Sequence, residues 1–184
     1  MSEWTQGVGQ RRLWKAEEFD GLKPTVYDWA RMAAFLDGEG NMNINPIHDM
    51  RRKNPLHLQV RILIGNTNPN LPVYLRNVFG GNIVLRNQQK YNPRAKQTYI
   101  WSCTSARAAW ILHNCMPWFI LKSAQASLLI NLQEEIDKTR QGRGRSVSTE
   151  RIASRIAMKN ELHRLNAKGC DNQIVISIDK LTGE

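Results

Sequence analysis

The chain has 184 residues, 41% of them hydrophobic, which is long enough to bury one sizeable core and predicts a single main domain. Lys and Arg number 26 against 16 Asp and Glu, and the resulting formal charge of +10 repels itself unless a polyanion neutralises it. We therefore expect nucleic acid as the partner; the alternative is a merely soluble basic protein.

The sequence gives no indication of membrane insertion or of secretion. No segment approaches the ~20 apolar residues that span a bilayer, and residues 1–6 lack the apolar run of a signal peptide. Cys103, Cys115 and Cys170 form no CxxC pair, so neither a disulfide framework nor a zinc site is suggested. We expect a soluble, intracellular protein without membrane contact, in a bacterial cytoplasm or an organelle.

The first elements in chain order are an arm and a helix. Residues 1–23 mix Gly, Arg, Lys and Trp without a clear period, which indicates an N-terminal arm that orders on something else, the alternative being a floppy tail. Thr25 and Asp28 then form a start resembling a capping box. The helix that they open is predicted to end near Leu36, before Gly38.

Two hairpins with a short helix between them are expected next. Apolar and polar residues alternate in each hairpin, which is typical of strands with one buried face. The predicted elements are strands over 41–45 and 57–64, a helix over 71–79 ended by Gly80 and Gly81, and strands over 82–88 and 98–104.

The C-terminal part is predicted to be mostly helical. The expected elements are helices over 106–115 and 119–138, a Gly and Arg linker over 140–145, a basic helix from Ser148 to about Leu165, and a short strand over 173–178. We divide the chain into an N-terminal arm (1–23), a core domain (24–139) and a basic C-terminal extension (140–184). The role of the extension does not follow from its sequence; clamping of flanking DNA is our hypothesis.

The order of these elements predicts an α+β fold, one αββαββα half with a four-stranded antiparallel sheet. Such a sheet has one face free of the core, and the alternation indicates which residues lie on it. They are Asn41, Asn43, Asn45, His57, Gln59, Arg61, Val84, Arg86, Gln88, Thr98, Ile100 and Ser102. Amides and guanidinium groups at alternate positions suit readout of base edges in a major groove, although any half-buried strand has a polar outer face.

Basic residues gather in the two predicted hairpin loops. They are Arg51, Arg52 and Lys53 in the first loop and Lys90, Arg94 and Lys96 in the second. We expect these side chains to contact DNA phosphates, which would make affinity fall steeply with salt.

The first predicted helix carries small residues and then acids. Ala30, Ala34 and Gly38 share one stripe, along which a second helix could approach closely. Asp37 and Glu39 follow at its end. If two copies of the chain met about a twofold axis, their acids would come together and would need a bridging divalent cation such as Mg²⁺. The alternative is a plain helix followed by a turn.

The segment Met32-Ala-Ala-Phe-Leu-Asp-Gly-Glu-Gly40 resembles the LAGLIDADG motif, with Met32 for its first Leu, Ala34 for its first Gly, and residues 37–40 as its acidic end. The similarity to LAGLIDADG homing endonucleases covers residues 25–138. It includes Pro117-Trp-Phe-Ile-Leu-Lys122, which looks like the element that carries the family's active-site lysine.

The resemblance implies a DNA-binding saddle-shaped sheet and a metal-dependent active site. Glu39 and a backbone carbonyl near Gly38 would bind Mg²⁺ or another divalent cation. Lys122 would be the active-site lysine, and Asn66 the polar residue at the end of the second strand. The contacts between subunits would include Ala30, Ala34, Asp37 and Gly38.

Because the sequence contains one such motif, each chain would supply half of the site. The resemblance therefore implies a homodimer that hydrolyses one phosphodiester in each strand of a long, near-palindromic DNA target and leaves short 3′ overhangs, as in intron homing. The alternatives are an RNA-intron maturase that binds host intron RNA, a DNA-binding regulator of the same fold that does not cleave, and a monomeric interaction protein.

Overall fold

The computed structural model describes residues 22–48, 56–86, 93–94, 96–139 and 147–167. Several predicted features lie outside these residues. They are the arm up to residue 21, Arg51, Arg52, Lys53, Gln88, Lys90, the linker over 140–145 and the strand over 173–178.

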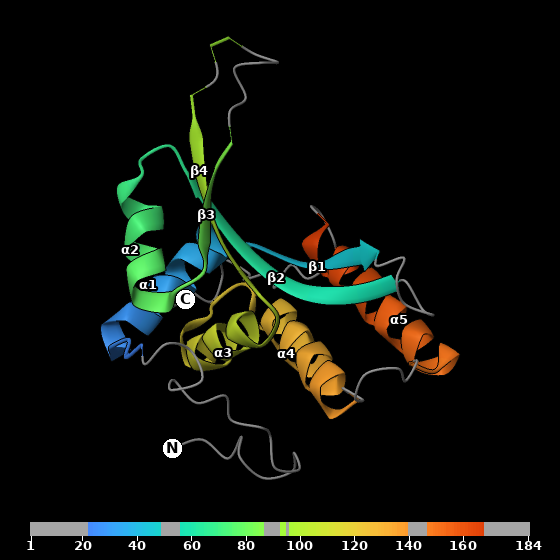
Figure 1. Cartoon of the computed structure of the whole chain (residues 1–184). Helices are drawn as coiled ribbons and strands as arrows, with labels where there is room; N and C mark the ends of the chain where they lie inside the picture. Colours follow the sequence, from blue (N-terminus) through green and yellow to red (C-terminus); the bar gives the residue numbers. More distant parts are fainter. Residues whose placement is uncertain (1–21, 49–55, 87–92, 95, 140–146, 168–184) are drawn as a thin grey trace, which may run out of the picture.

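The described elements alternate between helices and a sheet, in the predicted order (Figure 1). They are α1 (Val26–Gly38), β1 (Asn41–His48), β2 (Leu56–Asn66), α2 (Asn70–Phe79), β3 (Asn82–Arg86), β4 (Thr98–Thr104), α3 (Ser105–Cys115), the 3₁₀ turn η2 (Met116–Trp118), α4 (Ser123–Lys138) and α5 (Thr149–Asn166). The predicted α+β class is therefore confirmed.

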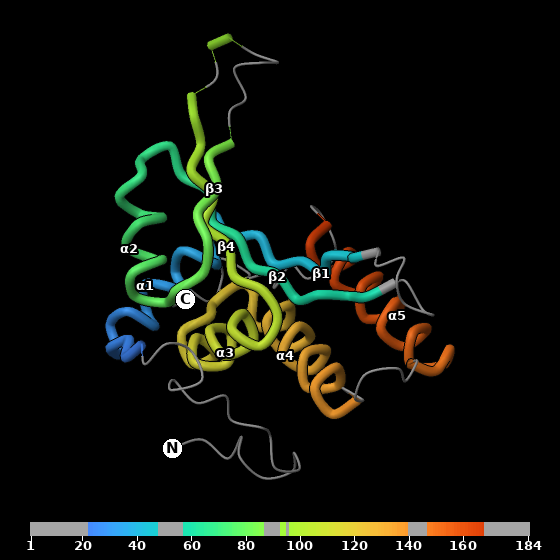
Figure 2. The backbone as a smooth tube through the Cα atoms, in the orientation of Figure 1, coloured from blue at the N-terminus to red at the C-terminus, as the bar shows by residue number. Residues whose placement is uncertain are grey.

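The four strands form one antiparallel sheet in the order β1-β2-β4-β3. The two hairpins meet through the end of β2 and the end of β4, where Arg61 pairs with Thr104 and Asn66 with Tyr99. From this shared centre the β1–β2 hairpin and the β3–β4 hairpin extend in different directions, which gives the sheet a curved, saddle-like course (Figure 2).

One face of the sheet packs on the helices and forms the core. Its buried side chains alternate along the strands, as the period of two predicts: Met42 and Ile44 in β1, Leu58, Val60, Ile62 and Ile64 in β2, and Trp101 and Cys103 in β4. Helices α3 and α4 lie below this face in Figure 1. Helix α1 is held by Trp29, whose ring lies 5.2 Å from that of Phe79 and 5.0 Å from that of Trp110.

The predicted start of α1 is confirmed. The Thr25 hydroxyl accepts a hydrogen bond from the backbone N–H of Asp28, and the Asp28 carboxylate accepts one from the backbone N–H of Thr25. The Tyr74 hydroxyl, on α2, also donates to Asp28, at 2.5 Å. This bond to Tyr74 and those to Thr25 hold the pKa of Asp28 below its usual value. The start of α1 is thus tied to α2.

Two boundaries depend on backbone geometry. The predicted stop at Gly80 and Gly81 is confirmed, because both residues have positive φ, which glycine adopts without steric cost. The predicted start of a helix at residue 119 is wrong, since α4 begins at Ser123 and Phe119 has extended backbone angles. The physical reason lies at the end of α1, whose Asp37 carboxylate accepts the backbone N–H groups of the intervening residues.

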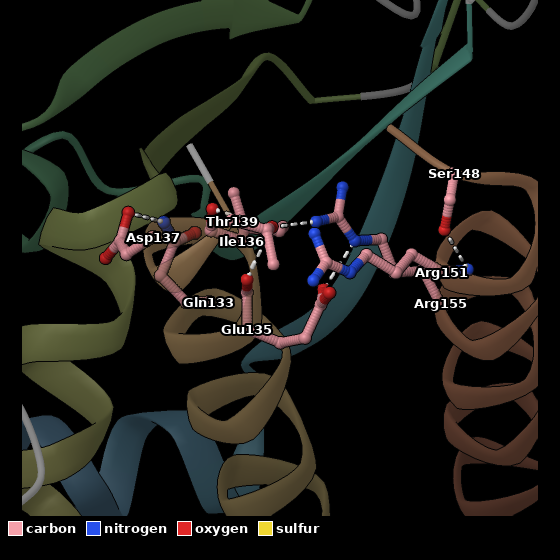
Figure 3. Close-up of polar contacts among 8 residues, drawn as sticks. All are labelled: Gln133, Glu135, Ile136, Asp137, Thr139, Ser148, Arg151 and Arg155. Carbon is pink, nitrogen blue, oxygen red and sulfur yellow. Dashed lines mark hydrogen bonds and ion pairs between the residues drawn. The ribbon is translucent and has the colours of Figure 1, made fainter. Parts of the chain in front are cut away.

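Helix α5 lies within the predicted extension and packs on the core. Ser148 caps it, as expected, by accepting from the backbone N–H of Arg151. Arg155 on α5 is buried, points to the end of α4, and bonds to Glu135 and Thr139 there (Figure 3). Leu162 on α5 is 2% exposed and joins the hydrophobic core.

The end of α5 also reaches the sheet. The Asn166 amide donates to the Met42 carbonyl at 2.9 Å, and the Gln125 amide of α4 donates to the Leu165 carbonyl at 3.1 Å. Because β1 is an edge strand, this contact covers backbone that would otherwise be open to pairing with another chain.

Two further observations concern the cysteines and the helices. Cys103 and Cys115 are buried thiols, and burial raises the pKa of Cys103 to about 12 and also raises that of Cys115. None of the helices in the described part of the chain is long and apolar enough to cross a membrane.

Candidate nucleic-acid interface and active site

The sheet face opposite the core carries the residues predicted for it, as far as these are described. Residues directly opposite each other in an antiparallel pair point to the same face. The register pairs Asn43 with Arg61, Asn45 with Gln59, and Arg86 with Thr98. None of the described residues on this face is buried, whereas the neighbouring positions in β2 are. We call this surface the free face.

Rows of side chains cross the free face from strand to strand. The central row is Asn41, Leu63, Ser102 and Asn82, one residue from each strand. Toward the tip of the β1–β2 hairpin the next rows are Asn43, Arg61 and Thr104, then Asn45 and Gln59, then Ile47 and His57. Toward the tip of the β3–β4 hairpin they are Gly65, Ile100 and Val84, then Thr98 and Arg86.

Five residues of the free face were not among those expected on it: Ile47, Leu63, Gly65, Asn82 and Thr104. The signal that could have found them was present, because each continues the alternation of its strand by steps of two from an expected residue. Their inclusion adds an apolar side chain to the centre of a face that otherwise looks polar there.

Hydrogen bonds orient some of the amides on the free face. Asn43 donates to the Asn41 side chain at 2.8 Å, and Gln59 donates to the Ser105 hydroxyl at 3.2 Å. Ser105 has a φ of +54°, a strained left-handed conformation, at the point where β4 turns into α3. Arg86, Arg94 and Lys96 are exposed toward the tip of the β3–β4 hairpin.

The end of α1 is joined to the segment before α4 by two reciprocal contacts. The Asp37 carboxylate accepts hydrogen bonds from the backbone N–H groups of Ile120, Leu121 and Lys122, at 2.8, 3.3 and 2.9 Å. In return the Lys122 ammonium group donates to the carbonyls of Leu36 and Gly40, both at 2.7 Å. We call this arrangement the Asp37–Lys122 clasp. Asp37, predicted to lie between subunits, thus uses its carboxylate within its own chain.

The clasp brings the Lys122 ammonium group to the carbonyl of Gly40, the residue that follows Glu39. Lys122 is half-buried, and desolvation lowers its pKa below the usual lysine value, an effect that the Asp37 charge partly offsets. Glu39 is exposed directly after α1, and its carboxylate makes no hydrogen bond or ion pair with any residue that the structure describes. A Cβ at Gly40 would lie 2.5 Å from the Leu36 Cα, so the tight turn after Glu39 requires glycine.

The hydrogen bond accepted by the Asn66 side chain involves neither Glu39 nor Lys122. Asn66 is the last residue of β2, and its side-chain oxygen accepts from the backbone N–H of Asn68 at 2.8 Å. By the alternation of the strand, it shares the side of Ile62 and Ile64, which face the core. The structure therefore gives Asn66 a turn-forming bond, and its catalytic role stays a prediction.

The small-residue stripe of α1 faces away from the core. Ala34 and Gly38 are exposed, and Ala30 is half-buried. A Cβ added at Gly38 would meet nothing within 4 Å. Ile120 and Leu121, which the clasp holds beside the end of α1, are 87% and 70% exposed. The stripe is thus open to a partner.

Hard cations favour oxygen ligands, and the exposed Glu39 carboxylate is such a ligand. Within the described residues, no group of three or more His, Cys, Asp or Glu could hold a metal ion. A metal at Glu39 would therefore need further oxygen ligands from backbone carbonyls, from DNA phosphates or from a second copy of the chain.

Several solved structures are similar to this one in fold. The homing endonuclease I-CvuI, solved with its DNA target in 2 mM Ca, is 15% identical, with a TM-score of 0.63 over 85% of this chain and 96% of that chain. The archaeal intron-encoded homing endonuclease I-Vdi141I, complexed with DNA, is 14% identical, with a TM-score of 0.62 over 78% and 87%. The LAGLIDADG meganuclease I-CpaMI, bound to uncleaved DNA, is 14% identical, with a TM-score of 0.57 over 84% and 48%.

This protein therefore has the LAGLIDADG homing endonuclease fold, as the sequence predicted. Comparison of the sequence itself with protein families and with curated proteins finds no match.

Proposed function

We propose that this protein is a site-specific, double-stranded DNA endonuclease that acts as a homodimer. The observation that carries this proposal is the end of α1. The exposed Glu39 carboxylate has no partner among the described residues, and the carbonyl of the next residue, Gly40, helps to hold the Lys122 ammonium group in place. A protein that only binds DNA gains nothing from an acid facing phosphate, because the two charges repel each other.

The free face supports DNA as the substrate. Its amides and arginines alternate along strands that are open to a partner, and the chain carries a net charge of +10. The homing endonucleases I-CvuI and I-Vdi141I, which share the fold, were solved in complex with DNA. The exposed basic residues Arg94 and Lys96 would contact phosphates and fix the register of the sheet in the groove.

Glu39 and a carbonyl at Gly38 would hold a divalent cation such as Mg²⁺. Mg²⁺ usually takes one or two carboxylates from a protein together with phosphate oxygens, and one exposed Glu39 per chain fits that requirement. When bound, the cation would polarise the phosphate and lower the pKa of a water molecule, so that the water loses a proton more readily and can attack the phosphorus. I-CvuI was solved with DNA in 2 mM Ca and in 2 mM Mg.

Lys122 would stabilise the charge that builds up on the phosphate. An ammonium group has three N–H donors, and the carbonyls of Leu36 and Gly40 take two of them. These two hydrogen bonds would aim the third N–H group at the phosphate, so that little reorganisation is needed when charge develops there.

The homodimer is proposed from the open stripe of α1. Ala30, Ala34 and Gly38 leave room for the backbone of a second helix, and the exposed Ile120 and Leu121 would add apolar area to that contact. This chain covers 96% of I-CvuI but 48% of I-CpaMI, as expected if two copies of this fold make one complete unit. Twofold symmetry implies a near-palindromic target, with one cut per strand and short 3′ overhangs.

The test is Mg²⁺-dependent cleavage of a randomised duplex library by the wild type and by Glu39→Gln, with sequencing of the cut ends. We expect cleavage by the wild type at one near-palindromic sequence, and a loss of at least about 100-fold in the variant with binding retained. The matched control is Glu150→Gln, which removes the same charge from the exposed start of α5 and should cleave normally. Specific binding without cleavage by the wild type would instead favour a regulator or a maturase.

A further inference from the structure

The free face is chemically divided along its length. From the central row toward the tip of the β1–β2 hairpin, it carries mainly amides and a guanidinium group: Asn43, Arg61, Asn45 and Gln59, with the single apolar side chain of Ile47 in the last row described. In the opposite direction it carries an apolar patch instead. Leu63 lies in the central row, and Ile100 and Val84 lie opposite each other in the next one. Val84 is 57% exposed, and Leu63 and Ile100 are half-buried.

A recess lies at the edge of this apolar patch, where Gly65 ends the row that contains Ile100 and Val84. Gly65 pairs with Ile100, so a side chain there would point to the free face, but glycine has none. A Cβ built on Gly65 would lie 3.5 Å from the Thr98 Cγ2 and 3.9 Å from the Ile100 Cγ1. These are ordinary van der Waals distances, so a methyl-sized group fits at Gly65 beside the methyl groups of its neighbours.

The surroundings of the patch indicate what covers it. The next row toward the hairpin tip contains Arg86, and the exposed Lys96 lies in the loop toward the same tip. With a net charge of +10, this surface suits a polyanion better than an apolar protein partner. The patch is also continuous with the amides of the free face, so the same duplex would cover both.

Apolar side chains cannot form hydrogen bonds with base edges. In the major groove the C5-methyl group of thymine is the apolar feature that distinguishes one base from the others. Leu63, Val84 and Ile100 can bury such a methyl group, and Gly65 leaves the space for it to approach the strand.

We infer that the patch of Leu63, Val84 and Ile100, with Gly65 at its edge, reads thymine methyl groups, so that each half-site contains required A·T pairs where this part of the sheet lies. The inference rests on the proposed DNA-binding function. It assigns the two ends of one sheet different chemistries of recognition: hydrogen bonding toward the β1–β2 tip and methyl contact toward the β3–β4 tip.

The experiment measures binding to duplexes in which uracil replaces thymine. A target is first selected from a randomised duplex library, and each thymine is then changed to uracil, one symmetric pair at a time, which removes the methyl group and keeps every hydrogen-bonding group. We expect one or two pairs of positions, on the side read by the β3–β4 hairpin, at which the exchange weakens binding about fivefold per half-site. The other thymines should show no effect.

Variants tie the effect to the patch. Val84→Thr keeps the side-chain shape and adds a hydroxyl, and Gly65→Ala fills the recess without a clash; each should reduce the thymine-to-uracil ratio at those positions. Val73→Thr, the same exchange at a 47% exposed position of α2, should leave the ratio unchanged. Equal binding of thymine and uracil at every position, or an undiminished ratio in both patch variants, would overturn the inference.

Binding is measured without Mg²⁺, and cleavage of the same duplexes is assayed separately. A failure to cleave therefore counts against the proposed endonuclease and leaves the methyl readout to be judged on the binding ratios. A failure to bind any duplex specifically would overturn both.

Discussion

The Asp37–Lys122 clasp can be tested by removing one carboxylate. In Asp37→Ala the backbone N–H groups of Ile120, Leu121 and Lys122 lose their acceptor, and the segment before α4 loses its attachment to the end of α1. Lys122 would no longer be held against the carbonyls of Leu36 and Gly40. Both the stability of the fold and the geometry of the proposed active site should suffer.

The size of the effect follows from the three hydrogen bonds. A bond to a charged group contributes about 1.5–3 kcal/mol, but the bond to Leu121 is long, at 3.3 Å, and the half-buried carboxylate is partly screened by solvent. We therefore expect a loss of about 2–3 kcal/mol in the free energy of unfolding, or a Tm lower by about 4–12 °C for a chain of this length. Asp37→Asn retains one acceptor oxygen and should lose less.

The assay is thermal and urea unfolding, followed by circular dichroism at one fixed protein concentration because dimerisation links stability to concentration. Glu39→Gln is the matched control, two residues along the chain. The Glu39 carboxylate has no partner among the described residues, so the Tm of Glu39→Gln should equal that of the wild type. Asp37→Ala should thus lose both stability and cleavage activity, whereas Glu39→Gln should lose only cleavage activity. An unchanged Tm in Asp37→Ala would refute the clasp as a structural contact.

Three other predictions follow from the packing and the charge. Leu162→Ala should destabilise the protein by about 2–5 kcal/mol in urea unfolding, since this side chain of α5 is 2% exposed in the core; no change would mean that α5 does not pack there. Gly38→Leu should give monomers in sedimentation experiments. The leucine side chain would begin in open space within the chain but would fill the space needed by a second α1. The control Ser154→Leu, on the exposed side of α5, should remain dimeric. A dimeric Gly38→Leu would place the interface elsewhere. Lys96→Ala should make the slope of log affinity against log salt concentration shallower by about one for each subunit, or about two for the dimer. An unchanged slope would show that Lys96 does not contact phosphate.

Local chemistry made much of this fold predictable. The start of α1 follows from Thr25 and Asp28, which are three residues apart and satisfy each other's backbone groups. The end of α2 follows from Gly80 and Gly81, which adopt positive φ. The faces of the strands follow from their period of two, because a strand cannot turn one side chain inward without turning the next one outward. Each of these signals involves residues close together in the chain.

Contacts between distant residues could not be read in this way. The late start of α4 depends on Asp37, more than eighty residues earlier, and the orientation of Lys122 depends on the carbonyls of Leu36 and Gly40. The packing of α5 likewise depends on a buried Arg155 whose partners lie on α4, across a segment that looks like a plain linker.

The sequence by itself determined the order of elements, most residues of the free face and the acidic end of α1, because short-range sterics and hydrogen bonding decide them. Tertiary structure alone decided that β4 lies between β2 and β3, that Asp37 serves its own chain, and that the apolar residues Leu63, Ile100 and Val84 form one patch with Gly65 at its edge. The reason is that side chains from three strands become neighbours through the register of the sheet, and register is set by the packing of the whole core.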